Sequence, residues 1–308
     1  MNSMEKADII VIGAGIAGLT AGLYASRAGM NVIILDKLGA GGQLLQIAEI
    51  ENYPGIFPSI SGFELSQTLY NQAKEAGAKF VQSAVISVDK KDSTFYVKTQ
   101  ENSYESLTLI IATGAEHRKI NLPGEEKFTG KGVSYCAVCD GNFFKGKTVA
   151  VVGGGDSACT EALYLADIAE HVHLIHRRDT FRATKTLADK AASNNKITLH
   201  LQTVVEEIEG TSFVESLKLK NTATGTSTRL NVSGVFICAG MIPQADLLSM
   251  IPKDKNGYII ASEKMSTTTP GLFVAGDVRT KPLRQLITAA NDGAIAAESA
   301  AEFIRNNK

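Results

Sequence analysis

The sequence predicts an α/β protein of two domains, one inserted into the other, and a repeated pattern is the main evidence. The stretches VIGAGIAGLTAGLYASRAGMNVIILDK, from Val11, and VVGGGDSACTEALYLADIAEHVHLIHRR, from Val151, align without a gap. Each has an apolar β-branched run, a glycine turn, an amphipathic segment and a second β-branched run. This order of strand, turn, helix and strand is the βαβ unit of a Rossmann-like dinucleotide-binding domain. A length of 308 residues also suits two domains.

Glycines stand in both stretches where a dinucleotide-binding turn requires them. We expect Gly13 and Gly153 to permit the tight turn. We expect Gly15 and Gly155 to let the backbone approach a pyrophosphate at the helix N-terminus, where free N–H groups attract anions. Turns that bind no nucleotide are the alternative, but two copies in register favour binding. Further candidates, which pack the helix against the strand or adjoin the phosphate, are Ala17, Gly18, Asp156, Ser157 and Ala158.

The two stretches differ where the second strand ends. Asp36 in the first stretch predicts hydrogen bonds to an unphosphorylated ribose, as in FAD or NAD, because a carboxylate repels a phosphate. At the same offset the second stretch has His176, Arg177 and Arg178, and Arg182 follows shortly after. Arginines grip a 2′-phosphate with charge-assisted hydrogen bonds, so this site is predicted to hold NADPH. A solvated basic edge is the alternative interpretation.

Two apolar strands frame the second βαβ unit and suit a bound flavin. They are LIIATGA, residues 109–115, and GLFVAGDV, residues 271–278, and a long helix of small residues follows the latter. The N-terminal turn of that helix, around residues 284–287 and including Arg284, is expected to place positive potential near the flavin ring. Asp277 is expected to hydrogen-bond a ribitol hydroxyl. The candidates at the two strand ends are Thr113, Gly114, Gly276 and Asp277.

The order of these segments predicts the domain organisation. A discontinuous FAD-binding domain is expected over residues 1–115 and 247–308. A continuous NADPH-binding domain, residues 116–246, is expected to be inserted into it. The crossings are expected near 112–119 and 239–245, which contain glycine and, in the second case, proline, as short linkers do.

Composition and charge argue against several classes of function. A net charge of −1 gives no electrostatic footprint for nucleic acid or for an anionic membrane. No stretch reads as a transmembrane helix, and the N-terminus lacks a signal-peptide pattern. Four cysteines are too few for a secreted disulfide scaffold. The sequence therefore predicts a cytoplasmic protein without nucleic-acid or membrane partners.

The stretch SYCAVCDGNFF, residues 134–144, carries the closely spaced pair Cys136 and Cys139. Such a pair can be half of a metal site, a structural disulfide or a redox-active pair. A zinc site normally needs four ligands, and the chain has no second CxxC, so no metal is expected. A structural disulfide would gain little from closing so small a loop. The remaining cysteines, Cys159 and Cys238, are expected to be buried and structural.

A redox-active disulfide is the most economical interpretation of the pair, because flavin and NADPH sites are predicted in the same chain. Electrons would pass from NADPH to the flavin, then to Cys136–Cys139, and then to an external disulfide. Asp140 follows directly and could supply or accept the proton that the exchange requires. A helix N-cap or a turn residue is the alternative role for Asp140.

Motifs along essentially the whole chain resemble those of bacterial low-molecular-weight thioredoxin reductases, class II pyridine nucleotide-disulfide oxidoreductases. The matching motifs are GAGIAG, GGQL, ENYPG, ATGA, CAVCDG, GGGDSA, HRRDTFRA, GDV and RQ. The resemblance implies that Cys139 lies next to the flavin and that Asp140 is the acid/base. It also implies that Cys136 attacks thioredoxin or a thioredoxin-like protein. Asp156 departs from the family pattern near the expected pyrophosphate.

The resemblance further implies non-covalent FAD, NADPH as the donor, and a homodimer. It assigns FAD contacts to Asp36, Gln43, Asn52, Asp277 and Gln285. The candidate set is completed by Gly42 and Leu286 for FAD and by Ile242 for NADPH.

A domain rotation is expected from which domain contains each site. The nicotinamide site and the cysteine pair would both lie in the inserted domain. Because each must contact the same flavin, they would contact it at different times. We therefore expect residues 116–246 to rotate about the two crossings, as the family does.

Other proteins of related fold or function would carry different motifs. A ferredoxin-linked reductase of the same fold should lack the arginines, and a ferredoxin–NADP reductase should lack the CxxC. A hydroperoxide-reductase component needs an extra N-terminal redox module. A glutathione-reductase-type enzyme would carry its cysteines within residues 40–60, where there are none. A non-catalytic flavin-based redox sensor is the rival from another class.

Overall fold

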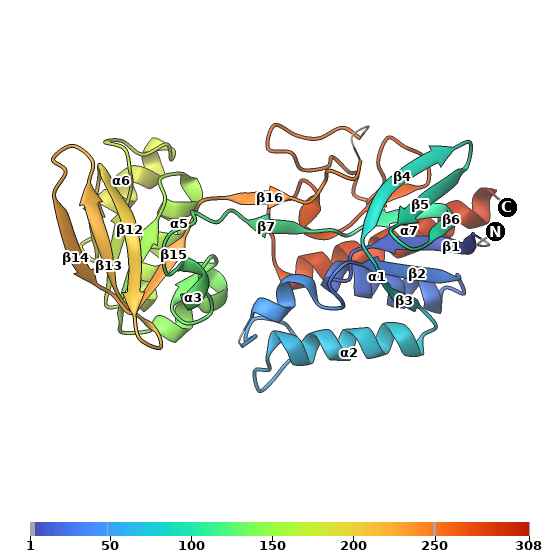
Figure 1. The fold of residues 1–308 in the computed structure, drawn as a ribbon, viewed down its shortest axis with the longest axis horizontal. Coiled ribbons are helices and arrows are strands. Elements are labelled where there is room, and N and C mark those ends of the chain that lie inside the picture. The colour runs from blue at the N-terminus through green and yellow to red at the C-terminus, as the bar shows by residue number, and fades with distance from the viewer. Residues whose placement is uncertain (1–3, 48, 249–250, 308) are drawn as a thin grey trace. The chain divides into compact units, whose positions relative to one another are not determined.

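The computed structural model describes residues 4–47, 49–248 and 251–307. The chain divides into two compact units, which are described separately. Unit 1 comprises Met1–Glu116 and Ile242–Lys308, and unit 2 comprises His117–Met241. Both units are α/β with parallel sheets, so the predicted fold class is confirmed (Figure 1).

Unit 1 is built on a seven-stranded sheet in which β3, β2, β1, β6 and β17 are parallel. The β-branched run of the first motif forms β1, and its alternate residues face opposite sides: Ile9 and Val11 pack in one core, Ile10 in another. Two antiparallel strands, β4 and β5, extend the sheet beyond β6. The strand bounds are β1 Glu5–Ile12, β2 Val32–Asp36, β3 Lys79–Gln82, β4 Val85–Lys91, β5 Thr94–Thr99, β6 Ser103–Ile111 and β17 Leu272–Val274.

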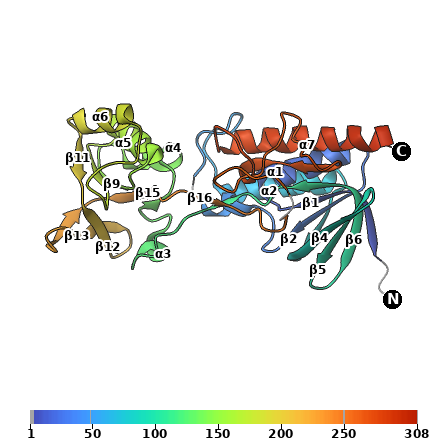
Figure 2. The same ribbon diagram turned by 90° about the horizontal axis from the view of Figure 1, so that it is seen from above.

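Unit 1 also contains three long helices (Figure 2): α1 Ile16–Arg27, α2 Gly62–Glu75 and α7 Leu286–Asn307. A capping box begins α2, in which Ser61 and Glu64 each accept a hydrogen bond from the other's backbone N–H. Helices α1 and α7 lie so close together that a Cβ at Gly293 would overlap the carbonyl of Ala17. The small residues of the last helix therefore let it lie directly on the first βαβ unit.

Unit 2 has a five-stranded parallel sheet in the order β11-β10-β9-β15-β8. Val149 and Val151 of β9 pack in one core with α5 and α6, whereas Ala150 packs in a second core with β12 and β13. The bounds are β8 Val133–Ser134, β9 Thr148–Val152, α5 Asp156–Ile168, β10 His171–Ile175, α6 Lys185–Ser193, β11 Ile197–His200, β12 Thr203–Gly210, β13 Val214–Asn221, β14 Ser227–Asn231 and β15 Gly234–Ile237.

Short elements complete the two units. In unit 1 they are the 3-10 turns η1 Gly42–Gln46 and η3 Gly276–Val278; in unit 2 they are α3 Glu125–Phe128, α4 Ala137–Asp140 and η2 Gly141–Phe144. Strand β7, Ala115–His117, pairs with β16, Met241–Pro243, where the chain passes between units. Among the described residues, no helix is long and apolar enough to cross a membrane.

The second unit boundary lies after Met241, earlier than the expected 246. Two hydrogen bonds explain this position: Thr113 Oγ1 donates to the carbonyl of Gln244, and Gln244 N–H donates to the carbonyl of Gly114 at 2.9 Å. Ala245 is buried in the unit 1 core. The residues after β16 are therefore held by unit 1.

Candidate active site

In the glycine turn of unit 1, two glycines have no room for a side chain and a third faces open space. Gly13 has φ +105°, and a Cβ there would overlap the carbonyl of Ala112. A Cβ at Gly18 would overlap the carbonyl of Gly13, whereas a Cβ at Gly15 would meet nothing within 4 Å. The turn therefore needs its first and third glycines for packing, and it leaves the N-terminus of α1 open to a ligand.

Asp36 lies at the end of β2, beside this turn. Its Oδ2 accepts a hydrogen bond from the Ala14 N–H at 2.8 Å, and its Oδ1 accepts from the N–H groups of Leu38 and Gly39 at 2.8 and 3.1 Å. These bonds fix the carboxylate at the strand end, which is where an adenosine ribose lies in a dinucleotide-binding fold.

Of the buried polar side-chain atoms that lack a hydrogen-bond partner in the described part of unit 1, two belong to residues predicted to contact FAD. They are Asp277 Oδ1 and Arg284 Nε, and within the described part of the chain only Ser26 Oγ shares this condition. Burial raises the pKa of the Asp277 carboxyl, and Lys281, with Nζ 3.6 Å from Oδ1, opposes that rise. Unpaired buried polar atoms are costly, so both atoms suit hydrogen bonds to a bound ligand. The residues present fit FAD.

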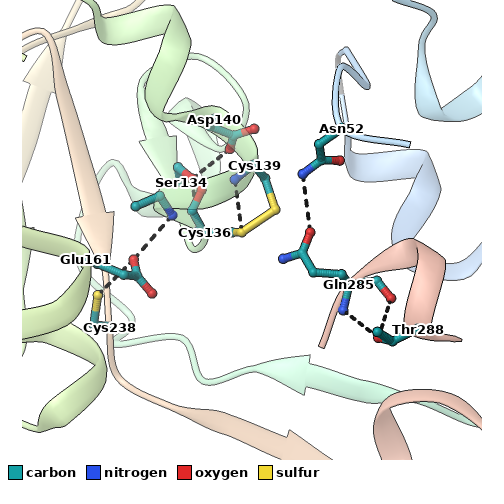
Figure 3. The surroundings of a disulfide bond; sticks show 10 residues. Asn52, Ser134, Cys136, Cys139, Asp140, Glu161, Cys238, Gln285 and Thr288 are labelled. Atoms are coloured by element: carbon teal, nitrogen blue, oxygen red, sulfur yellow. Dashed lines mark hydrogen bonds between the residues drawn. A yellow bond between two sulfur atoms is a disulfide. The ribbon is translucent and has the colours of Figure 1, made fainter. Parts of the chain in front are cut away.

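Two residues that the resemblance assigned to FAD, Asn52 and Gln285, are brought together, and others contact neighbours outside that set. Asn52 Nδ2 donates to Gln285 Oε1 at 3.3 Å, and the Gln285 N–H donates to Thr288 Oγ1 (Figure 3). Gln43 Nε2 donates to the carbonyl of Ala115. Arg284 lies over the ring of Tyr258, 3.9 Å from its centroid. The remaining unit 1 candidates lie in the turns and helix ends already described: Ala17, Gly42, Thr113, Gly114, Gly276 and Leu286.

The glycine turn of unit 2 repeats the open position of unit 1. A Cβ at Gly155, the residue before α5, would meet nothing within 4 Å, whereas one at Gly153 would press on Ala158 and Cys238. Gly154 was not singled out in the sequence, yet a Cβ there would overlap the imidazole of His176. Ser157 lies in the first turn of α5. The open N-terminus of α5 suits a second pyrophosphate.

In the basic segment after β10, residues 176–182, the histidine is buried and the arginines are exposed. His176 is 5% exposed, stacks on Phe181, and its Nε2 lies 3.1 Å from the carbonyl of Thr180. Arg177, Arg178 and Arg182 are exposed, and none forms an ion pair with another residue that the structure describes. Their guanidinium groups are thus available to a phosphate, while the imidazole supports the glycine turn. Ile242 lies in β16.

Cys136 and Cys139 form a disulfide in unit 2, with their Cα atoms 5.3 Å apart (Figure 3). Cys136 precedes the short helix α4, and its Sγ accepts a hydrogen bond from the Cys139 N–H at 3.2 Å. Ser134 Oγ accepts from the Cys136 N–H at 3.1 Å. Across the described residues, no group of three or more His, Cys, Asp or Glu side chains is arranged to hold a metal ion. The pair is thus placed as a disulfide in a short, hydrogen-bonded turn.

Asp140 lies at the end of α4, and its Oδ2 accepts a hydrogen bond from Ser134 Oγ at 2.6 Å. Burial raises the pKa of this carboxyl, and the bond from Ser134 opposes the rise. Asp140 precedes η2 but makes no side-chain capping bond there. A carboxyl with a raised pKa close to a disulfide suits proton transfer better than capping.

Two unit 2 features near the disulfide were missed by the sequence reasoning. Cys159 is fully buried, but Cys238 is only partly buried, and its thiol donates to Glu161 Oε2 at 3.2 Å. The same oxygen accepts from the Ala137 N–H, between the two cysteines of the pair, at 3.3 Å. No motif in the sequence marks Glu161, because the residues it contacts are distant in the chain.

The fold and these sites define a class of protein: an oxidoreductase with two dinucleotide-binding turns and a redox-active cysteine pair. Comparison with known proteins agrees. The family model for pyridine nucleotide-disulphide oxidoreductases matches residues 7–294, and the chain belongs to that family.

Relatives make the class more specific. The chain is 45% identical to a thioredoxin reductase of Treponema pallidum, over 96% of this chain and 97% of that protein. Its fold matches the crystal structure of thioredoxin reductase from Streptococcus pyogenes with a TM-score of 0.94 and 42% identity, covering 99% and 100% of the two chains. A ferredoxin-flavin thioredoxin reductase from Clostridium acetobutylicum is less similar, at 31% identity and a TM-score of 0.55, covering 99% and 100%. The resemblance stated from the motifs is therefore confirmed.

Proposed function

We propose that this protein is an NADPH-dependent thioredoxin-disulfide reductase of the cytoplasm that works as a homodimer with FAD. One observation carries the proposal. Unit 2 contains an open glycine turn, exposed arginines and the Cys136–Cys139 disulfide in one compact body. A protein that only binds a nucleotide has no use for a cysteine pair next to a carboxyl of raised pKa.

The cofactors are FAD and NADPH. In unit 1, the open turn at Gly15, the carboxylate of Asp36 and the buried Asp277 Oδ1 and Arg284 Nε, which accept or donate no hydrogen bond within the described structure, would hold FAD. In unit 2, the open turn and the exposed arginines, Arg177, Arg178 and Arg182, would hold NADPH. FAD, when bound, carries two electrons from NADPH to the cysteine disulfide.

The chain's own residues then complete the disulfide exchange. Two electrons and two protons convert the Cys136–Cys139 disulfide into two thiols. The Cys136 thiolate attacks a disulfide of thioredoxin, forming a mixed disulfide and releasing one partner thiolate. Cys139 next attacks Cys136 Sγ, which restores the internal disulfide and releases the reduced partner. Asp140 would hold or give a proton during these steps, and its bond from Ser134 and its raised pKa support that role.

We also propose that unit 2 rotates between the two half-reactions. The expected nicotinamide position and the cysteine pair belong to the same unit, and the expected flavin position belongs to the other. A rigid body that carries both must present them in turn. Disulfide cross-links that lock each of two orientations should each preserve one half-reaction and block the other. If nicotinamide and Cys139 were both found in contact with the flavin at once, rotation would be unnecessary.

The test of the function is steady-state reduction of a panel of thioredoxin-like proteins. NADPH, NADH and reduced ferredoxin should be compared as electron donors under the same conditions. The proposal requires rapid NADPH-dependent turnover with at least one thioredoxin, much slower turnover with NADH, and none with ferredoxin. Turnover driven by ferredoxin instead would support the same-fold alternative. Reduction of a peroxide-reducing protein but no thioredoxin would indicate a hydroperoxide-reductase component.

A further inference from the structure

A single carboxyl oxygen joins three segments of unit 2 beside the disulfide. Glu161 Oε2, on α5, accepts hydrogen bonds from the Ala137 N–H at 3.3 Å and from Cys238 Sγ at 3.2 Å (Figure 3). Ala137 immediately follows Cys136, and Cys238 directly follows β15. The carboxyl therefore ties the turn that contains the cysteine pair to the end of β15.

The surroundings of this carboxyl are unusual because no cationic side chain of the described residues neutralises it. Glu161 is partly buried and forms no ion pair with any residue described in the structure. Burial raises the pKa of Glu161, and the hydrogen bonds from Cys238 and Ala137 oppose the rise. A buried carboxyl without these donors would be costly. The thiol and the N–H thus offset part of the cost of keeping an acid at this place.

We propose that Glu161 is a positioning residue of the Cys136–Cys139 pair and that the Cys238 thiol holds Glu161 in place. Two effects act in the same direction. The accepted hydrogen bond fixes the backbone between the cysteines in the form seen with the disulfide closed. A negative charge beside the turn also disfavours the thiolate of the opened pair. Glu161 therefore shifts the equilibrium towards the disulfide.

This shift deepens the proposed function, on which it rests. A pair that favours its disulfide form gives up electrons more readily to an external disulfide. The proposed reductase needs that bias, because its cysteines must reduce another protein. Glu161 stabilises the disulfide form through the backbone of the turn and its charge, and not by a bond to either sulfur. In this proposal the Cys238 thiol, 3.2 Å from Glu161, holds the carboxyl in place and takes no part in electron transfer.

The test is the dithiol–disulfide equilibrium of the full-length, FAD-bound protein in dithiothreitol buffers, without NADPH or thioredoxin. Dithiothreitol donates two electrons and two protons to the Cys136–Cys139 bond and closes to its own cyclic disulfide. Alkylation and mass analysis then give the fraction of open pair. Glu161→Ala should shift the equilibrium about tenfold towards the dithiol, or about 30 mV for a two-electron couple. Glu161→Gln should shift it less, because the amide oxygen still accepts from Ala137.

Two cysteine variants complete the test. Cys238→Ala should shift the equilibrium in the same direction as Glu161→Ala, whereas Cys159→Ala, a matched change of a buried thiol on α5, should not. FAD content and Tm identify variants that fail to fold; if Glu161→Ala is one, Glu161→Gln and Cys238→Ala decide. Equilibrium constants equal to that of Cys159→Ala would overturn the proposal. Failure of the proposed function would appear separately, as absent NADPH-dependent turnover by the unaltered protein.

Discussion

The Asp156 carboxylate accepts a hydrogen bond from the backbone N–H of Thr184 at 2.7 Å. The carbonyl of Gly154 accepts another from the Arg182 N–H at 2.7 Å. These two bonds tie the basic segment to the glycine turn. The acid that departs from the family pattern thus has a partner inside the protein, and its bond helps to fix the segment that contains Arg182 next to the glycine turn.

Replacing Arg177 and Arg178 together by alanine should raise the KM for NADPH and leave the KM for NADH nearly unchanged. Each charge-assisted hydrogen bond contributes roughly 1.5–3 kcal/mol, so a loss of about 10- to 100-fold is expected for each bond removed. Steady-state kinetics with both nucleotides measures the difference. Arg27→Ala, an exposed arginine of unit 1, is the control. Equal losses with both nucleotides would show that the two arginines do not bind the 2′-phosphate.

The two cysteines should fail at different steps when each is replaced by serine. Cys139→Ser should still allow NADPH to bleach the yellow flavin colour, but it should abolish disulfide turnover, because no internal disulfide can form. Cys136→Ser should leave one alkylatable sulfur at Cys139 and also lose turnover. Stopped-flow absorbance and thioredoxin assays separate the steps, with Cys159→Ala as the control. Wild-type thioredoxin turnover in either serine variant would contradict the proposed electron path.

Asp277→Asn should weaken FAD binding. The buried Oδ1 has no hydrogen-bond partner within the described structure, and loss of one such bond to a ligand costs roughly 1.5–3 kcal/mol, or about 10- to 100-fold in Kd. Titration of the apoprotein with FAD, followed by flavin fluorescence, gives the Kd. Asp246→Asn, an exposed aspartate of the same unit, should leave it unchanged. An unaltered Kd for Asp277→Asn would remove this residue from the FAD site.

Asp140 should give disulfide exchange a distinctive pH dependence. Its pKa is raised by burial, so the carboxyl remains protonated to a higher pH than an ordinary aspartate. As an acid it should be effective below that raised pKa, and kcat/KM for the external disulfide should fall as the pH rises through it. Asp140→Asn should lower the rate by about 100-fold or more and abolish this fall. A variant that keeps the wild-type profile would exclude Asp140 as the acid.

A histidine cluster in unit 2 should make the protein less stable in mild acid. His173 Nδ1 lies 3.0 Å from His200 Nε2, and burial, with His200 and His171 nearby, lowers the pKa of His173 to about 4. Between about pH 4 and the ordinary value near 6.5, the unfolded chain binds more protons than the folded protein. Stability should therefore fall as the pH drops from 7 to 5. His173→Gln should reduce that loss of Tm; an identical loss would show that the cluster does not contribute.

The sequence was sufficient for the fold class and the family, because both depend on local patterns. Glycine spacing and β-branched runs fix the two βαβ units, and the cysteine pair with its neighbours is a short contiguous motif. Cys159 is buried as expected from its alignment with Leu19, and both residues lie in cores. The FAD and NADPH residue assignments remain predictions.

Other features depended on contacts between distant segments and could not be predicted. The packing of His176 against Gly154, and the bonds of Glu161, join segments that no spacing rule relates. The packing of β12 and β13 against one face of the parallel sheet also joins distant segments, so no local pattern reveals which face they cover. The end of unit 2 after Met241 depends on the same kind of contact, since Gln244 is held by residues 113–114.

The discontinuity of unit 1 has a consequence during synthesis. Unit 2 is one continuous stretch, whereas unit 1 lacks β17 and α7 until the last residues leave the ribosome. Domains generally fold as units when their chain is available. A stalled nascent chain that ends near residue 250 should therefore resist protease over 117–241 and be cut within 1–116; protection of 1–116 would contradict this. Asp277 and Arg284 also emerge late, so an FAD site that needs both residues would be completed only near the end of synthesis.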